Sequence, residues 1–199
     1  MSLTQVVALP AVLLASASPR RAELLTQINV EFEQISVNVP EERDPIEMPE
    51  EYVRRLALAK AKAGRALHVQ DSRPVIGADT IVVYDDMVFE KPRDQIHASA
   101  MLRRLSGVTH QVLTAVAVAT ATNEGVAISS TDVAFRPISD KEINAYWESG
   151  EPQDKAGGYA IQGQAALFVN KIDGSYSGVM GLPLFETAQL LHSLVGGDD

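Results

Sequence analysis

The chain has 199 residues, 46% hydrophobic and 22% charged, values typical of globular proteins that exclude disorder, collagen and coiled coil. Its length suits one core, and we predict a single domain over residues 1–199. The formal charge of −9 argues against nucleic-acid binding, and the lack of cysteine excludes disulfides, iron–sulfur clusters and thiolate zinc sites.

The beginning of the sequence does not have the pattern of a membrane segment. The apolar stretch over residues 6–17 contains Pro10, is too short to span a bilayer and lacks a basic leader. The four histidines are scattered, without the i, i+4 pairs typical of zinc sites on helices. We therefore expect a cytoplasmic protein that binds neither membrane nor nucleic acid, and the sequence leaves a homodimer open.

The first predicted elements place a helix directly after a strand. Residues 12–15 are typical of a buried strand, and Pro19 suits a first helical position. A second strand near residues 32–36 precedes a Pro- and acid-rich loop over 37–50. Residues 49–67 have helical spacing, with an apolar stripe made of Tyr52, Val53, Leu56, Ala59, Ala63 and Leu67.

The central strand carries an unexpected pair of polar residues. Residues 74–84 are apolar and β-branched, yet Asp79 and Thr80 lie in their middle. A helix capped by Asp94 follows and ends near Ser106.

The second half alternates strands and helices. Strands over 110–120 and 128–135 flank a turn, and Ser139 with Glu142 forms a capping box for a short helix. The final helix runs from about 183 to 194. This mixture predicts the α/β class, with a twisted mixed β-sheet flanked by helices.

The turn after the first strand has the chemistry of a phosphate site. Ser16, Ser18, Arg20 and Arg21 place two hydroxyls and two guanidinium groups beside a helix N-terminus. An ordinary helix cap by Ser18 with two surface arginines explains the pattern about as well. No Walker A string occurs in the chain, so a P-loop kinase is not expected.

The carboxylate of Asp79 is expected to be paired or bound to metal, because an isolated charge in an apolar strand is costly. Together with Glu41 it would supply a site for Mg²⁺ or Mn²⁺. The alternative is that Asp79 points outward or accepts a backbone hydrogen bond. Lys60 and Lys91 are phosphate candidates, although most lysines are simply solvated.

A glycine-rich stretch over residues 154–163 indicates close approach of the backbone to a ligand. A loop-to-strand bulge accounts for the glycines equally well. Gln162 is the notable member, because a side-chain amide offers both a donor and an acceptor to the N3–H and O4 edge of a pyrimidine.

These strings together resemble the Maf family of nucleotide pyrophosphatases over nearly the whole chain. Six of them occur in the family's order, at residues 14–21, 77–80, 90–92, 106–114, 154–163 and 181–184. The resemblance implies a two-lobed fold with a central cleft, like that of Maf and ITP pyrophosphatases. It also implies metal-dependent hydrolysis of a nucleoside triphosphate to the monophosphate and pyrophosphate.

The resemblance further assigns roles to single residues. It implies that Asp79 is the proton acceptor or a metal-bound carboxylate, and that Glu41, Lys60 and Lys91 are the other polar active-site residues. Arg20, Thr80 and Gln162 resemble the branch that prefers dTTP and UTP, whereas the branch acting on 7-methyl-GTP carries Trp, Gln and Glu there.

Two other functions compete with this interpretation. One is a pyrophosphatase for the deaminated purine nucleotides ITP and XTP, which would need a purine-shaped pocket. The other is a non-catalytic regulator of cell division, since the family name is linked to inhibition of septum formation.

Overall fold

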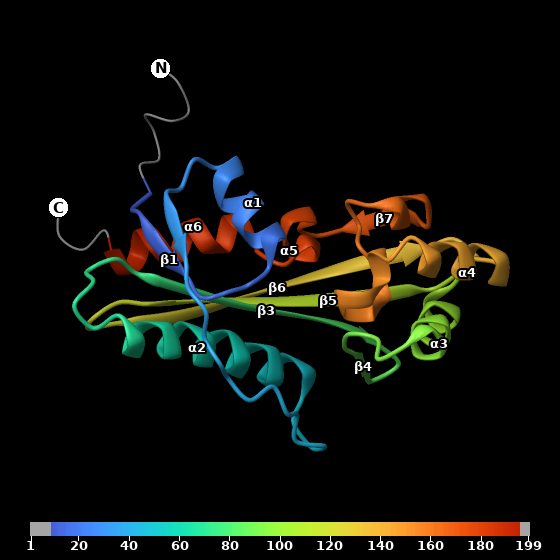
Figure 1. The fold of residues 1–199 in the computed structure, drawn as a ribbon, viewed down its shortest axis with the longest axis horizontal. Coiled ribbons are helices and arrows are strands. Elements are labelled where there is room, and N and C mark those ends of the chain that lie inside the picture. Colours follow the sequence, from blue (N-terminus) through green and yellow to red (C-terminus); the bar gives the residue numbers. More distant parts are fainter. Residues whose placement is uncertain (1–8, 196–199) are drawn as a thin grey trace. The chain divides into compact units, whose positions relative to one another are not determined.

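The computed structural model describes residues 9–195, and in this part of the chain seven strands form one mixed sheet (Figure 1). The strands are β1 (Val12–Leu14), β2 (Phe32–Gln34), β3 (Val75–Tyr84), β4 (Met87–Phe89), β5 (Thr109–Ala119), β6 (Glu124–Phe135) and β7 (Val169–Asp173). Their order is β2-β1-β3-β5-β6-β7, with β4 paired to β3. The predicted α/β class is confirmed.

Six α-helices accompany the sheet in the described residues. They are α1 (Pro19–Gln27), α2 (Pro49–Leu67), α3 (Gln95–Leu105), α4 (Asp140–Glu148), α5 (Tyr176–Met180) and α6 (Leu184–Val195). Short 3₁₀ segments are η2 (Glu151–Asp154), η3 (Ala156–Gly158) and η4 (Gln164–Leu167). None of the helices in residues 9–195 combines the length and apolar character needed to cross a membrane.

The chain divides into two compact units. The first unit is Met1–Asp79, Thr114–Ser129 and Gly181–Asp199, and the second unit is Thr80–Leu113 and Ser130–Met180. The long strands β3, β5 and β6 contribute residues to both units. The sequence predicts a single domain, and the division into two compact units does not test that prediction.

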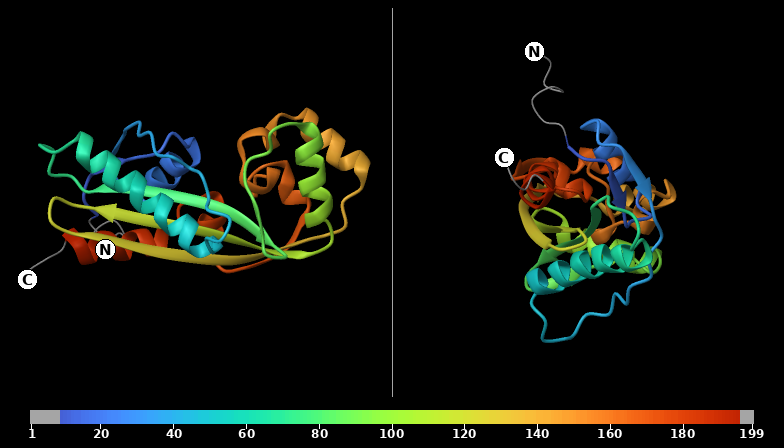
Figure 2. Two further views of the ribbon diagram at one scale, coloured as in Figure 1. Left: turned by 90° about the horizontal axis from the view of Figure 1, so that it is seen from below. Right: turned by 90° about the vertical axis from the view of Figure 1, so that its left-hand side faces the viewer.

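The first unit is a sheet covered by helices on both faces. Strand β1 pairs in parallel with both β2 and β3. The two crossovers, through α1 and α2, run in opposite directions along the sheet, so their right-handed connections place the two helices on opposite faces. Figure 2 shows α2 on one side of these strands, with α1 and α6 on the other.

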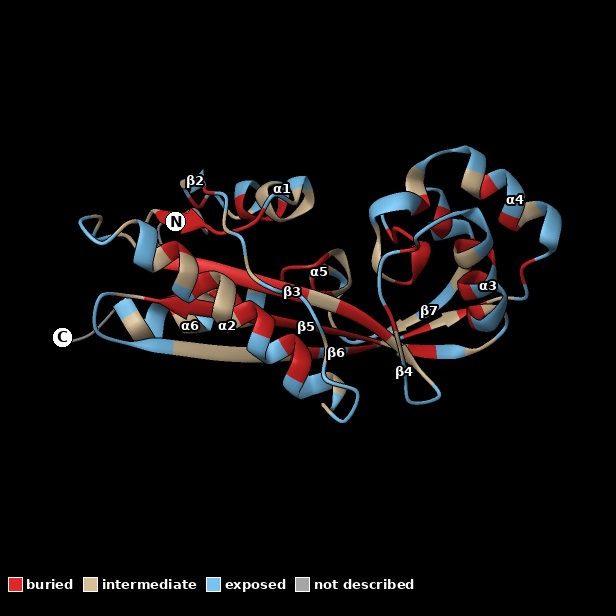
Figure 3. Ribbon diagram, turned by 60° about the horizontal axis from the view of Figure 1, so that its bottom comes forward, coloured by how far each residue is buried: buried red, intermediate tan, exposed pale blue. Residues whose placement is uncertain are grey.

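The strands at the centre of the sheet are buried along most of their length, as the colouring of β3 and β5 in Figure 3 shows. Their nearly continuous apolar sequence is typical of strands covered on both faces. Strands β5 and β6 are neighbours joined by residues 120–123, where the Thr120 N–H donates to the Asn123 carbonyl at 2.8 Å. The predicted hairpin is confirmed, but β6 begins at Glu124, four residues before the start expected from the sequence.

Helix α2 packs through small residues other than those of the predicted stripe, in which Ala59 and Ala63 are only half-buried. Tyr52, Val53 and Leu56 are buried as expected, but the buried face then continues through Ala57, Ala61 and Gly64. The expectation for Leu67 was wrong, since that residue is 66% exposed. Small side chains let the helix backbone approach the sheet. Contacts with the sheet therefore determine which face of α2 is buried.

Helix α2 and the sheet approach each other closely at Gly77 of β3. A Cβ atom there would lie 2.4 Å from the Ala57 carbonyl oxygen and 2.5 Å from the Ala61 nitrogen, both backbone atoms of α2. Glycine at this position therefore sets the distance between α2 and β3.

We expect Gly77→Ala to lower the free energy of unfolding by about 1–3 kcal/mol, because the helix backbone has to move away. Urea unfolding followed by circular dichroism measures this loss. Gly150→Ala is the control, since a Cβ there meets nothing within 4 Å and only the positive φ of +76° opposes it. A Gly77→Ala protein no less stable than wild type would contradict the close-packing argument.

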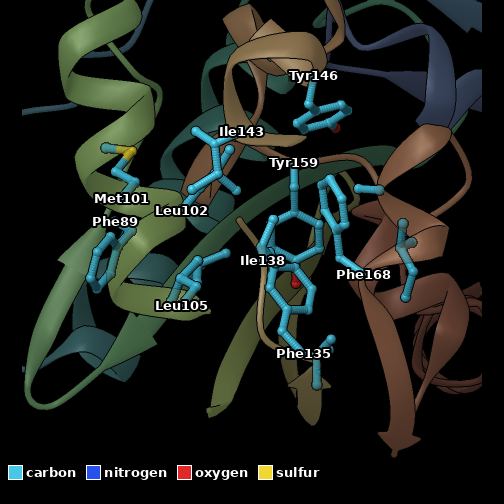
Figure 4. Close-up of a cluster of buried hydrophobic side chains, with 14 of the residues drawn as sticks. Phe89, Met101, Leu102, Leu105, Phe135, Ile138, Ile143, Tyr146, Tyr159 and Phe168 are labelled. Atoms are coloured by element: carbon cyan, nitrogen blue, oxygen red, sulfur yellow. The ribbon is translucent and has the colours of Figure 1, made fainter. Parts of the chain in front are cut away.

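The second unit has its own hydrophobic core, formed where α3 and α4 pack on the strands. Phe135, Tyr146, Tyr159 and Phe168 lie in this cluster (Figure 4). The rings meet edge to face, with 4.8 Å between the centroids of Phe135 and Tyr159. The predicted N-caps are confirmed here, since Asp94 accepts from the His97 N–H at 2.7 Å and the Ser139 capping box is formed.

His110 is buried in the same core, with 2% of its surface exposed. Its Nε2 is 2.8 Å from the Tyr159 hydroxyl. Burial lowers the pKa of His110 to about 4, from an ordinary value of 6.5. The folded protein therefore binds a proton at this ring more weakly than the unfolded chain does.

This difference predicts acid sensitivity. The stability that the neutral ring allows is present above pH 6.5 and is lost as the pH falls toward 4, a loss of about 3 kcal/mol. Between pH 7 and pH 4, the free energy of unfolding of His110→Gln should therefore fall by about 3 kcal/mol less than that of wild type, as measured by urea unfolding. The exposed His192→Gln is the control. Parallel stability curves for wild type and His110→Gln would refute the prediction.

Candidate functional site

The centre of the candidate site is a lysine held between two carboxylates. Lys60 Nζ of α2 donates to Asp79 Oδ1 at 2.7 Å and lies 2.6 Å from Glu41 Oε1. The side chains of Lys60 and Asp79 are 13% and 12% exposed, whereas that of Glu41 is 52% exposed. All three residues belong to the first unit. The alternative that Asp79 points outward is wrong.

The fold positions this cluster through three local features. Asp79 follows Gly77 by two residues, so both lie on the face of β3 that meets α2. Lys60 precedes Ala61, one of the residues in closest contact with that face. The Tyr52 hydroxyl of α2 donates to the Glu41 carbonyl at 2.7 Å and ties the acidic loop to the helix.

Burial dominates the electrostatics of the cluster. It raises the pKa of Asp79 above its ordinary value, even though Lys60 and Arg21 act in the opposite direction. Burial also lowers the pKa of Arg21, an effect that the charge of Asp79 opposes. Arginine nevertheless stays protonated in proteins, so Arg21 keeps a positive charge near the carboxylates.

The serine- and arginine-rich turn folds around the hydroxyl of Ser16. This oxygen accepts from Arg21 Nη1 at 3.1 Å and from the Ser18 N–H at 3.2 Å. Arg21 Nε also donates to the Gly181 carbonyl at 2.7 Å. Ser18 holds the N-cap position of α1 as predicted, but its side chain makes no capping hydrogen bond. Arg20, the next residue after Pro19, is half-buried in the first turn.

The remaining predicted residues belong to the second unit. Lys91 is exposed just after β4, and Gln162 is exposed in a turn before η4. The Gly157 N–H donates to the Glu90 carbonyl at 3.1 Å, so the glycine-rich stretch lies beside the Glu-Lys-Pro segment. Thr80 follows Asp79 on β3 and therefore points to the opposite face of the strand.

Some supporting residues were missed from the sequence. Tyr52 was assigned only to an apolar stripe, and its hydroxyl gives no separate pattern. Gln34 Nε2 donates to the Ser16 carbonyl at 3.0 Å and steadies the turn from β2, a contact across 18 residues of chain. Such contacts depend on strand pairing, which no local motif encodes.

Together the fold and site define an α/β protein that gathers two carboxylates, an ammonium and a guanidinium group in one unit, a combination suited to phosphate and to a cation bound with it. The chain belongs to the Maf family, since the family model described as Maf-like protein matches residues 11–194.

Several curated relatives support this assignment. A dTTP/UTP pyrophosphatase of Pseudoalteromonas translucida is 56% identical over 94% of this chain and 98% of its own. Proteins of the same name from Saccharophagus degradans and Shigella dysenteriae are 56% and 55% identical, each over 89% of this chain and 86% and 90% of their own. A solved structure, protein VC0702 from Vibrio cholerae, has 17% identity, covers 61% of this chain and 62% of its own, and has a TM-score of 0.35, too low to bear on the fold.

Proposed function

We propose that this enzyme hydrolyses dTTP and UTP to the monophosphate and pyrophosphate. The observation that carries the proposal is the Lys60 ammonium between Glu41 and Asp79, two carboxylates that also interact electrostatically with Arg21 of α1. It places acid–base and charge-neutralising groups within one cluster. The names of relatives that match nearly the whole chain support the same reaction.

Asp79 takes the role of base in this mechanism. In the metal-free protein burial raises the pKa of this carboxylate, and a carboxylate whose pKa lies nearer the working pH accepts a proton from water more readily. The activated water attacks the α-phosphorus, and the bond to the leaving pyrophosphate breaks. Lys60, Lys91 and Arg20 offset the charge that develops on that group.

A divalent cation, Mg²⁺ or Mn²⁺, fits the carboxylates of the first unit. We propose Asp79 and Glu41 as its protein ligands, because their oxygens already share one cation, Lys60 Nζ, at 2.7 and 2.6 Å. Magnesium commonly takes one or two carboxylates and completes its shell with phosphate oxygens and water. When bound, the ion would neutralise phosphate charge.

The other residues are proposed to bind and select the nucleotide. Ser16, Ser18 and Arg21 surround a helix N-terminus, where N–H groups favour an anion. Thr80 and Gln162 are assigned to base selection, with the Gln162 amide pairing with the N3–H and O4 edge of uracil or thymine. We propose the cytoplasm as the compartment, since it holds the nucleoside triphosphate pool.

The experiment is pyrophosphate release from a panel of dTTP, UTP, CTP, ITP, XTP and 7-methyl-GTP, with Mg²⁺, Mn²⁺ or EDTA. We expect metal-dependent release that is fastest from dTTP and UTP. Preference for ITP or XTP would instead support a deaminated-purine pyrophosphatase. No release from any nucleotide would favour a regulatory protein.

A further inference from the structure

The exposed residue Gln162 lies in a short segment that is held at its two ends by two residues outside it. Residues 160–165 make a turn that leads into η4, with Ala160, Ile161 and Ala165 buried and Gln162 exposed. The turn itself contributes one backbone hydrogen bond within these residues, from the Gly163 N–H to the Ala160 carbonyl at 3.0 Å. Its position is therefore set largely by what contacts it.

Glu151 of η2 caps the end of this segment. Its Oε2 accepts from the Gln164 N–H at 3.0 Å, and its Oε1 lies 3.5 Å from the Ala165 nitrogen. These are the first two residues of η4, whose N–H groups have no acceptor within the helix. A negative charge at this end of a helix is also favourable electrostatically.

Tyr146 of α4 holds the start of the segment. Its hydroxyl accepts from the Ala160 N–H at 3.1 Å and donates to Glu151 Oε1 at 2.7 Å. The side chain is 3% exposed and belongs to the aromatic core of the second unit (Figure 4). Burial raises the pKa of Tyr146 beyond its ordinary range, so the phenol keeps the proton that it donates to Glu151.

The space around Gly163 shows how closely the carboxylate fits against the turn. A Cβ atom at Gly163 would lie 2.2 Å from Glu151 Oε2. The φ of Gly163 is −104°, which any residue adopts, so glycine is needed here for space alone. Any side chain at this position would displace the carboxylate from the turn.

We infer that Tyr146 and Glu151 are positioning residues for base selection, because they fix at both ends the segment that presents Gln162. We call this pair and its hydrogen bonds the Tyr146–Glu151 clamp. The inference rests on the proposed role of Gln162 in contacting the base. Fixing the backbone on both sides of Gln162 in advance lowers the entropy lost when a pyrimidine binds, and it sets the position from which the amide reaches the base edge.

The test compares kcat/KM for UTP and CTP in wild type, Glu151→Gln, Tyr146→Phe, Gly163→Ala and Gln162→Ala. We expect Glu151→Gln, Tyr146→Phe and Gly163→Ala each to lower the ratio of kcat/KM for UTP to kcat/KM for CTP about tenfold, mainly through a higher KM for UTP. A loss of this size corresponds to one poorly placed hydrogen-bonding group. The double variant of Glu151→Gln and Gln162→Ala should have the same preference for UTP over CTP as Gln162→Ala alone, because both changes act through the same contact.

Two controls separate positioning from loss of structure. Asp94→Ala removes the carboxylate that caps α3, in the same unit, and should lower stability while keeping the UTP preference. Amide hydrogen exchange should become faster at Gln164 and Ala165 in Glu151→Gln, while exchange in the rest of the unit stays near the wild-type rate.

The outcomes distinguish the two proposals. If Gln162→Ala keeps the preference for UTP, the proposed role of Gln162 in base selection is wrong. The role of the Tyr146–Glu151 clamp in base selection is then wrong as well. If Gln162→Ala loses the preference but Glu151→Gln and Gly163→Ala keep it, the clamp alone is overturned. Unchanged exchange at Gln164 and Ala165 in Glu151→Gln would also overturn it.

Discussion

Replacement of Asp79 by Asn is expected to lower pyrophosphate release from dTTP about 10³-fold, because the amide cannot accept the proton of the attacking water. The change keeps the shape of the side chain but weakens one of the two proposed metal ligands, so nucleotide binding has to be measured apart from turnover. Single-turnover kinetics with saturating nucleotide separates the two effects. A variant that keeps a tenth or more of wild-type turnover would show that Asp79 is not the base.

The same substitution should make the protein more stable at neutral pH. The pKa of Asp79 is raised in the folded state, so its contribution to stability is fully present below the ordinary aspartate range and is lost as the pH rises through the folded pKa. Asn cannot ionise and avoids that loss. Lys60 keeps Glu41 as a partner at 2.6 Å, so the change leaves no isolated cation.

Asp71→Asn is a matched control with the opposite sign. Hydrogen bonds from Arg73 lower the pKa of Asp71 to about 2, so this carboxylate stabilises the fold above pH 3.8. Urea unfolding at pH 7 should therefore show Asp79→Asn above wild type and Asp71→Asn below it. The gain of Asp79→Asn should vanish near pH 4. An Asp79→Asn protein less stable than wild type at pH 7 would contradict the burial argument.

Replacement of Lys60 by Ala should have two separate effects. Turnover should fall about 10²-fold, the usual cost of removing one group that stabilises charge in the transition state. The nucleotide-free protein should bind Mn²⁺ about tenfold more tightly, because Glu41 and Asp79 lose the ammonium that now neutralises both. Calorimetry and Mn²⁺ electron paramagnetic resonance measure the second effect without any turnover.

The control for Lys60 lies on the same helix. Lys62 is exposed and pairs with Glu124 at 2.9 Å, so Lys62→Ala should change neither turnover nor Mn²⁺ binding. Lys60→Arg keeps the charge and should keep Mn²⁺ binding weak. If Lys60→Ala binds Mn²⁺ no better than wild type, the two carboxylates are not the metal ligands.

The sequence by itself determined most of the local structure. The helix over residues 49–67 was predicted with its observed bounds, because Pro at the first position and regular apolar spacing act over a few residues. The Asp94 cap and the Ser139 capping box were predicted for the same reason. An aspartate in an apolar strand also pointed to a partner, since an unpaired charge is costly there. Strand β7 was missed because it is an edge strand without a buried apolar run, and helix α5 was missed because it spans only five residues.

The tertiary structure decided which residues meet. Whether Asp79 meets Lys60 depends on how closely α2 approaches Gly77, and that distance is set by backbone contacts across the layer. The buried face of α2 passes through Ala57 and Ala61 for the same reason, away from the predicted Leu67. Propensity and spacing act between near neighbours in the chain, whereas the pairing of charges and the clamping of a turn depend on packing between distant segments, which only the folded chain brings into contact.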